Sequence, residues 1–267
     1  MNLYKIAIVV PWFKETLEKD EEFSMFHLEK FLGNHDIIIT APEGLAISKQ
    51  YQIVRFPKYY FQSIPAYSRL LLSKVFYEEF QAYSHILIYQ HDALVFSSDL
   101  IPFCQQGYDY IGAPIFKRYS HKPIFSRVGN GGLSLRRVAA FLDVLNSTRY
   151  TQKKVPILKE LFTTRIPDLD EWPLARLWLK KLRILRAVRM GVEAYTRQYS
   201  LNEDLFWSDR AQLFYPDFTI APIDTALKFS FDKYPRYCFE QNHHQLPFGC
   251  HAWVKWDRAF WEPYLLK

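Results

Sequence analysis

The segment ILIYQHDALVF, residues 86–96, places three polar residues inside an otherwise apolar run. Its first four residues are apolar or aromatic, which is typical of a buried β-strand, and its last three are apolar again. Gln90, His91 and Asp92 lie between them. A carboxylate in apolar surroundings is costly unless it is paired or holds a cation. The segment therefore predicts a strand that ends at a capping or a functional carboxylate.

Similar apolar segments recur along the first hundred residues, with helical patterns between them. KIAIVV (5–10), HDIIIT (35–40) and HILIYQ (85–90) are short and rich in Ile and Val, as strands buried on both faces are. The segments 20–34 and 63–80 have the start and stop signals of helices. This alternation predicts an α/β fold with a mostly parallel central sheet flanked by helices.

The ends of the predicted strands carry the first candidate site residues. Ligands of parallel sheets bind beyond the carboxyl ends of the strands, and Pro11, Trp12 and Asp92 occupy such positions. Asp92 either caps a turn or holds a divalent metal that bridges the phosphates of a nucleotide. His91 is expected to point to the opposite face, because neighbouring strand residues alternate in direction. We favour Asp92 as the functional residue of the two.

Composition and charge narrow the class of protein. The chain has 267 residues, of which 49% are hydrophobic and 18% aromatic, so it can bury a substantial core. Its net charge is +6, but no nucleic-acid-binding motif accompanies that charge, so no nucleic-acid partner is expected. No apolar run approaches the ~20 residues that span a bilayer, and we find no signal peptide. A cytoplasmic protein is the expectation.

The positive charge is concentrated in a predicted insertion, residues 150–200. Residues 176–197 contain seven Lys or Arg and one acid, Glu193. The segment 174–197 is predicted to be helical, with an apolar stripe beside the basic one. It either packs on the rest of the domain with its charges in water, or makes a peripheral contact with anionic lipid at the inner face of the membrane.

Three later motifs carry further candidates, each with a plain structural alternative. VGNGGLSLRR (128–137) has three close glycines, which permit positive φ and close approach to a ligand, or simply form a tight hairpin. LNEDLFWSDR (201–210) has two acids at a predicted helix N-terminus, where they either complement the helix dipole or supply a base. LPFGCHAW (246–253) contains His251, either a structural histidine or an imidazole ligand for Mn²⁺.

Taken together, the motifs resemble a family of bacterial and fungal domains of unknown function that is similar to GT-A glycosyltransferases. The stretches that carry the resemblance cover nearly the whole chain outside the insertion, in the order VVPWF, YSRLLLSKVFYEEF, ILIYQHDALVF, GYDYIGAP, GNGGLSLRR, NEDLFWS and PFGCHAW. The resemblance implies a GT-A-like nucleotide-diphospho-sugar transferase fold. It also implies two partners, a nucleotide-sugar donor and a saccharide or lipid-linked acceptor.

The resemblance further implies a metal-dependent donor site. GT-A enzymes hold Mn²⁺ or Mg²⁺ and the donor diphosphate with an Asp-x-Asp motif. The matching stretch here is residues 90–92 or residues 92–94, so one of the two acids is missing. The implied metal ligands are Asp92 and His251. The implied donor-binding residues are Pro11, Trp12, Arg69, Gln90 and Asp92.

The acceptor side is implied by the order of the later motifs. In inverting transferases that these motifs resemble, a Gly-rich acceptor loop precedes a pair of acids, one of which acts as the base. By that likeness Asp204 is the catalytic base, Glu203 orients the acceptor, and Asn130, Gly131 and Gly132 bind it. An inverting displacement needs one carboxylate opposite the leaving group and cations beside the diphosphate, which these residues fit.

We therefore expect a single domain, 1–267, with a nucleotide-binding half (1–125) and an acceptor half (126–267) that carries the insertion. The expected function is that of an inverting glycosyltransferase in cell-surface polysaccharide synthesis. The alternative is a non-catalytic nucleotide-sugar-binding module, because the acid motif is incomplete. A metal-dependent phosphate or phosphodiester hydrolase is a third possibility, although it predicts more clustered acids and histidines than the sequence contains.

Overall fold

The computed structural model describes residues 4–47, 50–117, 119–148, 182 and 190–266. The predicted insertion 150–200 and the predicted basic helix 174–197 lie mostly outside the described residues. Apart from residue 182, only their last part, from residue 190 on, is described, and it contains the short helix α8 (Val192–Thr196).

Six strands form the central sheet, and the predicted strands 5–10, 35–40 and 85–90 are three of them. In spatial order the strands are β3 (Gln52–Phe56), β2 (Asp36–Pro42), β1 (Ile6–Pro11), β4 (His85–Tyr89), β9 (Leu133–Arg137) and β6 (Tyr110–Ile111). β3, β2, β1 and β4 run parallel, whereas β9 runs antiparallel to both of its neighbours. The central sheet is therefore mostly parallel, which confirms the predicted fold class.

The order of the strands reverses at the centre of this sheet. From β1 the chain adds β2 and then β3 on one side, and it later adds β4 on the other side of β1. A crevice forms outside the carboxyl ends of the strands at such a reversal, because the connecting segments leave in opposite directions. The segments that follow Pro11 and Tyr89 therefore flank a natural position for a ligand.

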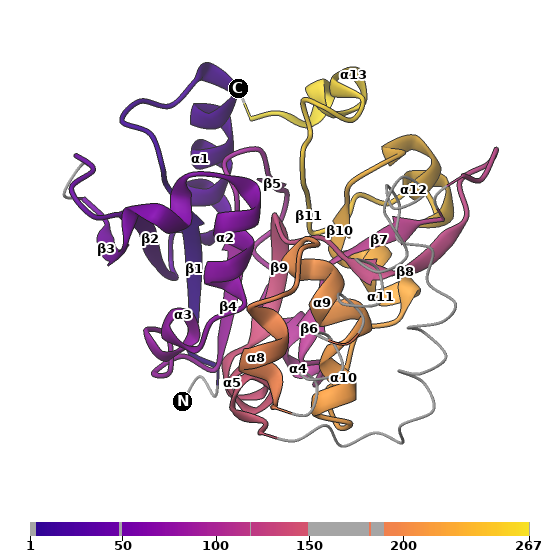
Figure 1. Ribbon diagram of the computed structural model, residues 1–267. Coiled ribbons are helices and arrows are strands. Elements are labelled where there is room, and N and C mark those ends of the chain that lie inside the picture. Colours follow the sequence, from indigo (N-terminus) through magenta and orange to yellow (C-terminus); the bar gives the residue numbers. More distant parts are fainter. Residues whose placement is uncertain (1–3, 48–49, 118, 149–181, 183–189, 267) are drawn as a thin grey trace, which may run out of the picture.

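Helices cover both faces of the sheet (Figure 1). The helices on one face are α2 (Ile64–Leu71), α3 (Lys74–Glu78), α5 (Val138–Asn146), α8, α9 (Glu203–Asp209) and α10 (Ala211–Phe214). Those on the other are α1 (Lys19–Leu32), α4 (Ile101–Gln105) and α11 (Ile223–Phe229). β1 and β4 are buried on both faces along their whole length, which explains their nearly continuous apolar sequences. Among the described residues, no helix combines the length and apolar character that a membrane span requires.

Smaller elements surround the carboxyl ends of the central strands. They are η1 (Lys58–Phe61), the hairpin of β7 (Ala113–Phe116) and β8 (Phe125–Gly129), a second sheet of β10 (Ser230–Phe231), β11 (Gly249–Cys250) and β5 (Leu94–Val95), and the C-terminal helices α12 (Pro235–Gln241), α13 (Arg258–Trp261) and η2 (Glu262–Tyr264). A separate buried cluster around Trp253 and Trp261 supports the second sheet.

The segment 63–80, predicted as one helix, forms two. Its start is as expected, because the Ser63 hydroxyl accepts a hydrogen bond from the backbone N–H of Ala66 at 3.3 Å. After α2 the Ser73 hydroxyl donates to the carbonyl of Leu70 at 2.6 Å, and α3 then begins. Serine hydroxyls compete with the backbone in this way, which accounts for the break.

Candidate active site

A cavity of about 840 Å³ lies where the strand order reverses, beyond the carboxyl ends of β1 and β4. Small-molecule and cofactor sites typically occupy ~300–1,000 Å³, so this volume suits a ligand of that class. Segments from the whole length of the chain meet there. The polar residues that line it include Gln90, Asp92, Asn130, Glu203, Asp204, Asp232, Lys233, His251 and Lys255.

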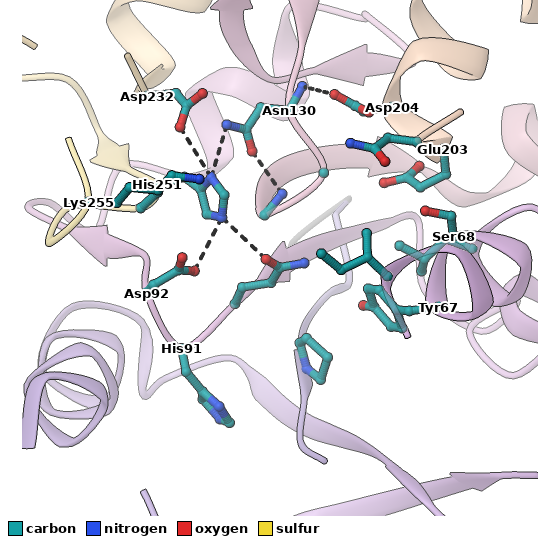
Figure 2. Close-up of a pocket in the computed structure, with 18 of the residues that line it drawn as sticks. Tyr67, Ser68, His91, Asp92, Asn130, Glu203, Asp204, Asp232, His251 and Lys255 are labelled. Atoms are coloured by element: carbon teal, nitrogen blue, oxygen red, sulfur yellow. Dashed lines mark hydrogen bonds and ion pairs between the residues drawn. The ribbon is translucent and has the colours of Figure 1, made fainter. Parts of the chain in front are cut away.

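One edge of the second sheet gathers Asp92, Asp232 and His251 (Figure 2). β10 and β11 are parallel, so Asp232 and His251 follow them at the same end, and the antiparallel β5 begins at that end, shortly after Asp92. Backbone hydrogen bonds fix this register: the His251 N–H donates to the carbonyl of Phe231 at 2.9 Å, and the Trp253 N–H donates to that of Asp92 at 3.2 Å. Three distant parts of the chain thus form one charged cluster.

The imidazole of His251 stands between two carboxylates. Nε2 lies 3.2 Å from Oδ1 of Asp92, and Nδ1 lies 3.4 Å from Oδ1 of Asp232. Burial lowers the pKa of His251, but the hydrogen bonds and charges of the two carboxylates outweigh it and raise that pKa to about 9. For Asp92 the effect of burial has the opposite sign and raises the pKa. The hydrogen bond and charge of His251 outweigh it, so the pKa of Asp92 lies below its ordinary value.

His91 points away from this cluster, as expected (Figure 2), but His91 and Asp92 both lie in the turn that follows β4 and not in a strand. Its ring packs edge-on against Trp12, with the ring centroids 4.7 Å apart. Burial lowers the pKa of His91 to about 4, which favours the neutral ring. Asp92, in contrast, has 49% of its side chain exposed. His91 is therefore a buried residue that packs against Trp12 at the cavity wall, whereas about half of the Asp92 side chain is exposed.

The Gly-rich loop before β9 turns at Asn130 and not at a glycine. Asn130 has a φ of 79°, whereas the three glycines around it lie outside the left-handed region, so they do not use the positive φ that glycine permits. Asn130 tolerates the turn because its side-chain oxygen accepts a hydrogen bond from the Gly132 N–H at 2.8 Å. The glycines make room for side chains. A Cβ on Gly131 would overlap the carboxylate of Glu203, and one on Gly132 would overlap the imidazole of His251.

Glu203 is held in a buried ion pair with Arg136. Oε1 of Glu203 accepts a hydrogen bond from Nη2 of Arg136 at 2.8 Å, and the two side chains are 5% and 0% exposed. Arg136 also donates to the hydroxyls of Ser134 at 3.0 Å and Tyr77 at 2.9 Å. Burial raises the pKa of Glu203 above its ordinary value, and the charge of Arg136 offsets part of that rise. Glu203 thus lies in the cavity wall with one oxygen committed to Arg136.

Asp204, the next residue of α9, is less buried than Glu203 and also lines the cavity. Its Oδ2 accepts a hydrogen bond from the backbone N–H of Asn130 at 3.1 Å. Burial raises the pKa of Asp204, and backbone hydrogen bonds from Asn130 and Leu205 offset part of that rise. A carboxylate of raised pKa at a cavity wall is suited to accept a proton from a bound group.

Two lysines that no sequence motif indicated line the same end of the cavity as Asp92. Lys233 follows Asp232 directly, and Lys255 comes four residues after His251. Their ammonium groups lie 4.9 and 5.1 Å from the ring centroid of Trp256. Cation–π contacts of this kind orient an exposed cation without neutralising its charge. Asp232 itself had a signal in the sequence, because FSFDK (229–233) places a carboxylate after an apolar run, as ILIYQHD does.

The structure brings most of the expected site residues together. Those that line the cavity are Pro11, Gln90, Asp92, Asn130, Gly131, Gly132, Glu203, Asp204 and His251. Two expected donor-binding residues are not among them. Arg69 is exposed on α2, whose residues Tyr67 and Ser68 line the cavity instead, and Trp12 packs against the ring of His91.

The Asp92 end of the cavity offers donor atoms of the kinds that a divalent cation takes. A carboxylate oxygen and an imidazole nitrogen lie side by side there, and such a pair suits Mn²⁺. Among the residues that the structure describes, however, no three His, Cys, Asp or Glu side chains gather in an arrangement that could hold a metal ion. The residues present fit a cation only if an amide oxygen, water or substrate completes its shell.

Comparison with known families identifies the chain at the level of its family. A family model described as a protein of unknown function, DUF5672, matches residues 50–251, and the chain belongs to that family. No curated protein is significantly similar to it in sequence.

Several solved structures show a distant likeness to the whole chain. A galactosyltransferase, LgtC, in complex with donor and acceptor sugar analogs has 12% identity and a TM-score of 0.49, with 98% of this chain and 96% of that chain covered. A glycosyltransferase involved in glycosylation of the major capsid of PBCV-1 has 10% identity and a TM-score of 0.44, with 97% of each chain covered. The apo-form glycosyltransferase GlyE of Streptococcus pneumoniae has 14% identity and a TM-score of 0.43. The match covers 98% of this chain but only 60% of the GlyE chain.

Proposed function

We propose that this member of the DUF5672 family is a glycosyltransferase that moves a sugar from a nucleotide-diphosphate donor to an acceptor hydroxyl. The cavity at the reversal of strand order supports this proposal, because that position in an open parallel sheet is where nucleotides bind. The order of the seven motifs supports it independently, through their resemblance to GT-A-like domains. On that resemblance we also assign the reaction to cell-surface polysaccharide synthesis.

The donor diphosphate is proposed to bind at the Asp92 end of the cavity. Lys233 and Lys255 are exposed there and carry the positive charge that a diphosphate needs. Asp92 and His251 are the residues that would hold Mn²⁺ or Mg²⁺ at the same place. When bound, such an ion neutralises charge on the diphosphate as it leaves.

The acceptor is proposed to bind on the other side of Asn130, next to Asp204. Asn130 connects the two sides, since its backbone N–H bonds Asp204 and its side-chain amide nitrogen lies 3.1 Å from Nδ1 of His251 (Figure 2). In the reaction the acceptor oxygen forms a bond to the anomeric carbon while the bond from that carbon to the diphosphate breaks. The acceptor proton passes to Asp204, and the bonding electrons leave with the nucleoside diphosphate. Because one carboxylate acts as base without a covalent intermediate, the anomeric configuration is inverted.

One observation carries this proposal: the carboxylate of Asp204 lines the same cavity as the cationic side chains of Lys233, Lys255 and His251, and Asn130 contacts both Asp204 and His251. Acid–base work and charge stabilisation are the two functions that an inverting displacement requires of a protein. Glu203 completes the arrangement by fixing the start of α9 through Arg136.

The test is release of nucleoside diphosphate from UDP-, GDP- and dTDP-sugars, or of CMP from a CMP-sugar, in the presence of simple saccharide acceptors. We expect turnover with one nucleotide class. Asp204→Asn should lower kcat by about 100-fold or more, because a positioned general base contributes ~10²–10⁴ in rate. It should leave donor binding, followed by calorimetry, nearly unchanged.

The matched control is Asp209→Asn, which removes a carboxylate from the same helix outside the cavity, where it pairs with Arg127 at 3.0 Å. This variant should keep the wild-type kcat. Equal losses in the two variants would contradict a base role for Asp204. Tight donor binding without turnover on any acceptor would replace the proposal with the alternative, a non-catalytic nucleotide-sugar-binding module.

A further inference from the structure

Three atoms that can act as metal ligands lie close together at the Asp92 end of the cavity: an imidazole nitrogen, a carboxylate oxygen and an amide oxygen. Nε2 of His251 lies 3.2 Å from Oδ1 of Asp92 and also 3.2 Å from Oε1 of Gln90. Nε2 can carry one N–H, but it faces two acceptor oxygens. One of these oxygens therefore keeps lone pairs that a cation could use. Nearly half of the Asp92 side chain is exposed, so the convergence is open on the side of the cavity.

The two spacings match those between neighbouring ligands of a small divalent cation. Ligand bonds of ~2.1 Å at right angles place adjacent donor atoms about 3 Å apart, close to the distances found here. Carboxylate, amide oxygen and imidazole are together an acceptable set for Mn²⁺, and for Mg²⁺ with less preference. The spacings of the two oxygen atoms from Nε2 of His251 therefore already suit a cation.

Backbone hydrogen bonds fix the main chain of Gln90 beside the Gly-rich loop. Its N–H donates to the carbonyl of Gly132 at 2.9 Å, and its own carbonyl accepts from the N–H of Ala93 at 2.9 Å. Gly132 is also the residue at which a Cβ would overlap the ring of His251. Gly132 therefore lies against both the backbone of Gln90 and the ring of His251.

The other nitrogen of His251 has a partner for each tautomer. With a proton on Nε2, Nδ1 accepts from the side-chain amide of Asn130, whose nitrogen is 3.1 Å away. With Nε2 bare, as a metal ligand must be, the proton on Nδ1 faces Oδ1 of Asp232 at 3.4 Å. Histidines that bind metals commonly donate their second N–H to a carboxylate in this way. The carboxylate of Asp232 is therefore placed to accept the second N–H of His251 in that tautomer.

We propose that Gln90 Oε1 is the third protein ligand of a divalent cation held by Asp92 and His251, in the place where an Asp-x-Asp motif has its first carboxylate. The inference rests on the metal site of the proposed function and adds a ligand that its motif lacks. The three ligands carry a single negative charge, one less than with a second carboxylate. The free protein should therefore bind the cation weakly, and a diphosphate, with its own charge and oxygens, should strengthen that binding.

The experiment measures Mn²⁺ binding directly, by loss of the free-ion signal in electron paramagnetic resonance, without nucleotide or turnover. Gln90→Glu restores a carboxylate at nearly the same position and should tighten Mn²⁺ binding by about tenfold or more, because ligand charge sets affinity. Gln90→Met removes the oxygen at similar volume and should weaken binding by about tenfold. Asp92→Asn should weaken it further.

The control is Gln62→Glu, which adds the same charge to the same cavity at an exposed position of its lining. Its effect should stay within about threefold of the wild type, since an exposed charge in water is strongly screened. Thermal unfolding midpoints establish that each variant is folded. The proposal is overturned if Gln90→Glu gains no more affinity than Gln62→Glu, or if Gln90→Met binds Mn²⁺ as the wild type does. Failure of the transferase proposal looks different: Mn²⁺ binding follows Gln90, but no sugar nucleotide is turned over.

Discussion

Two carboxylates that line the cavity, Glu203 and Asp92, each pair with a cationic side chain, and the two pairs differ in their surroundings. Arg136 and Glu203 are 0% and 5% exposed, and three donor groups of Arg136 bond protein atoms. His251 and Asp92 are 18% and 49% exposed, and acceptors outnumber donors around the ring. The closed pair is satisfied by the protein itself, whereas the open pair has capacity for a ligand. In this molecule the closed pair stabilises the cavity wall, whereas the open pair can bind a ligand.

The largest expected effect comes from breaking the closed pair. Arg136→Met leaves the carboxylate of Glu203 buried without its partner, which typically costs about 3–5 kcal/mol. Urea unfolding at pH 7.5 should show that loss as a lower midpoint at an unchanged slope. Arg127→Met, which removes a partly exposed pair with Asp209, is the control and should cost at most about 1 kcal/mol. A loss below 1 kcal/mol in Arg136→Met would remove the distinction between the two pairs.

A smaller effect distinguishes the two histidines on either side of Asp92. Burial lowers the pKa of His91 to about 4, from 6.5, so its contribution to stability is present above pH 6.5 and is lost as the pH falls toward 4. For His251, whose pKa is raised to about 9, the contribution is present below pH 6.5 and is lost as the pH rises through 9. The two histidines therefore respond to pH with opposite signs.

Replacing His91 by Phe keeps a ring against Trp12 and removes the titration. Among the described residues neither ring nitrogen of His91 has a hydrogen-bond partner, so no such bond is lost. On going from pH 8 to pH 5, the wild type should lose about 2 kcal/mol more unfolding free energy than His91→Phe. Urea unfolding of both proteins at the two pH values gives this difference, from which the effects of the other histidines cancel. Equal losses of unfolding free energy in the wild type and in His91→Phe would mean that the folded protein does not lower the pKa of His91.

The strands that could be predicted from the sequence are those that are buried on both faces of the sheet. β1, β2 and β4 are buried on both sides, so their sequences are continuous apolar runs that periodicity detects. β3 is an edge strand, half exposed and interrupted by Arg55, and it left no such signal. The strands of the second sheet have two residues each, too few for any pattern.

The same physical limit applies to the site. Asp92 and His251 were recognisable because a polar residue stands out in an apolar or aromatic segment. The sequence did not show which of the two acids, Glu203 or Asp204, forms an ion pair within the protein, because the answer depends on Arg136. That residue lies in the strand LSLRR, and nothing in the local sequence shows that its charge turns inward, toward α9. Partners that are far apart in sequence decide such questions.

The most direct test of the central claim, that the open pair is the donor site, is thermal unfolding in the presence of sugar nucleotides. The wild type and Asp92→Asn are compared with UDP-, GDP-, CMP- and dTDP-sugars, with and without Mn²⁺. A ligand that binds only the folded state stabilises it by RT ln(1 + [L]/Kd), about 2.7 kcal/mol at a hundredfold excess over Kd. We predict a Mn²⁺-dependent rise in Tm for one nucleotide class that is lost in Asp92→Asn. No rise with any sugar nucleotide, or a rise that Asp92→Asn retains in full, would contradict the claim.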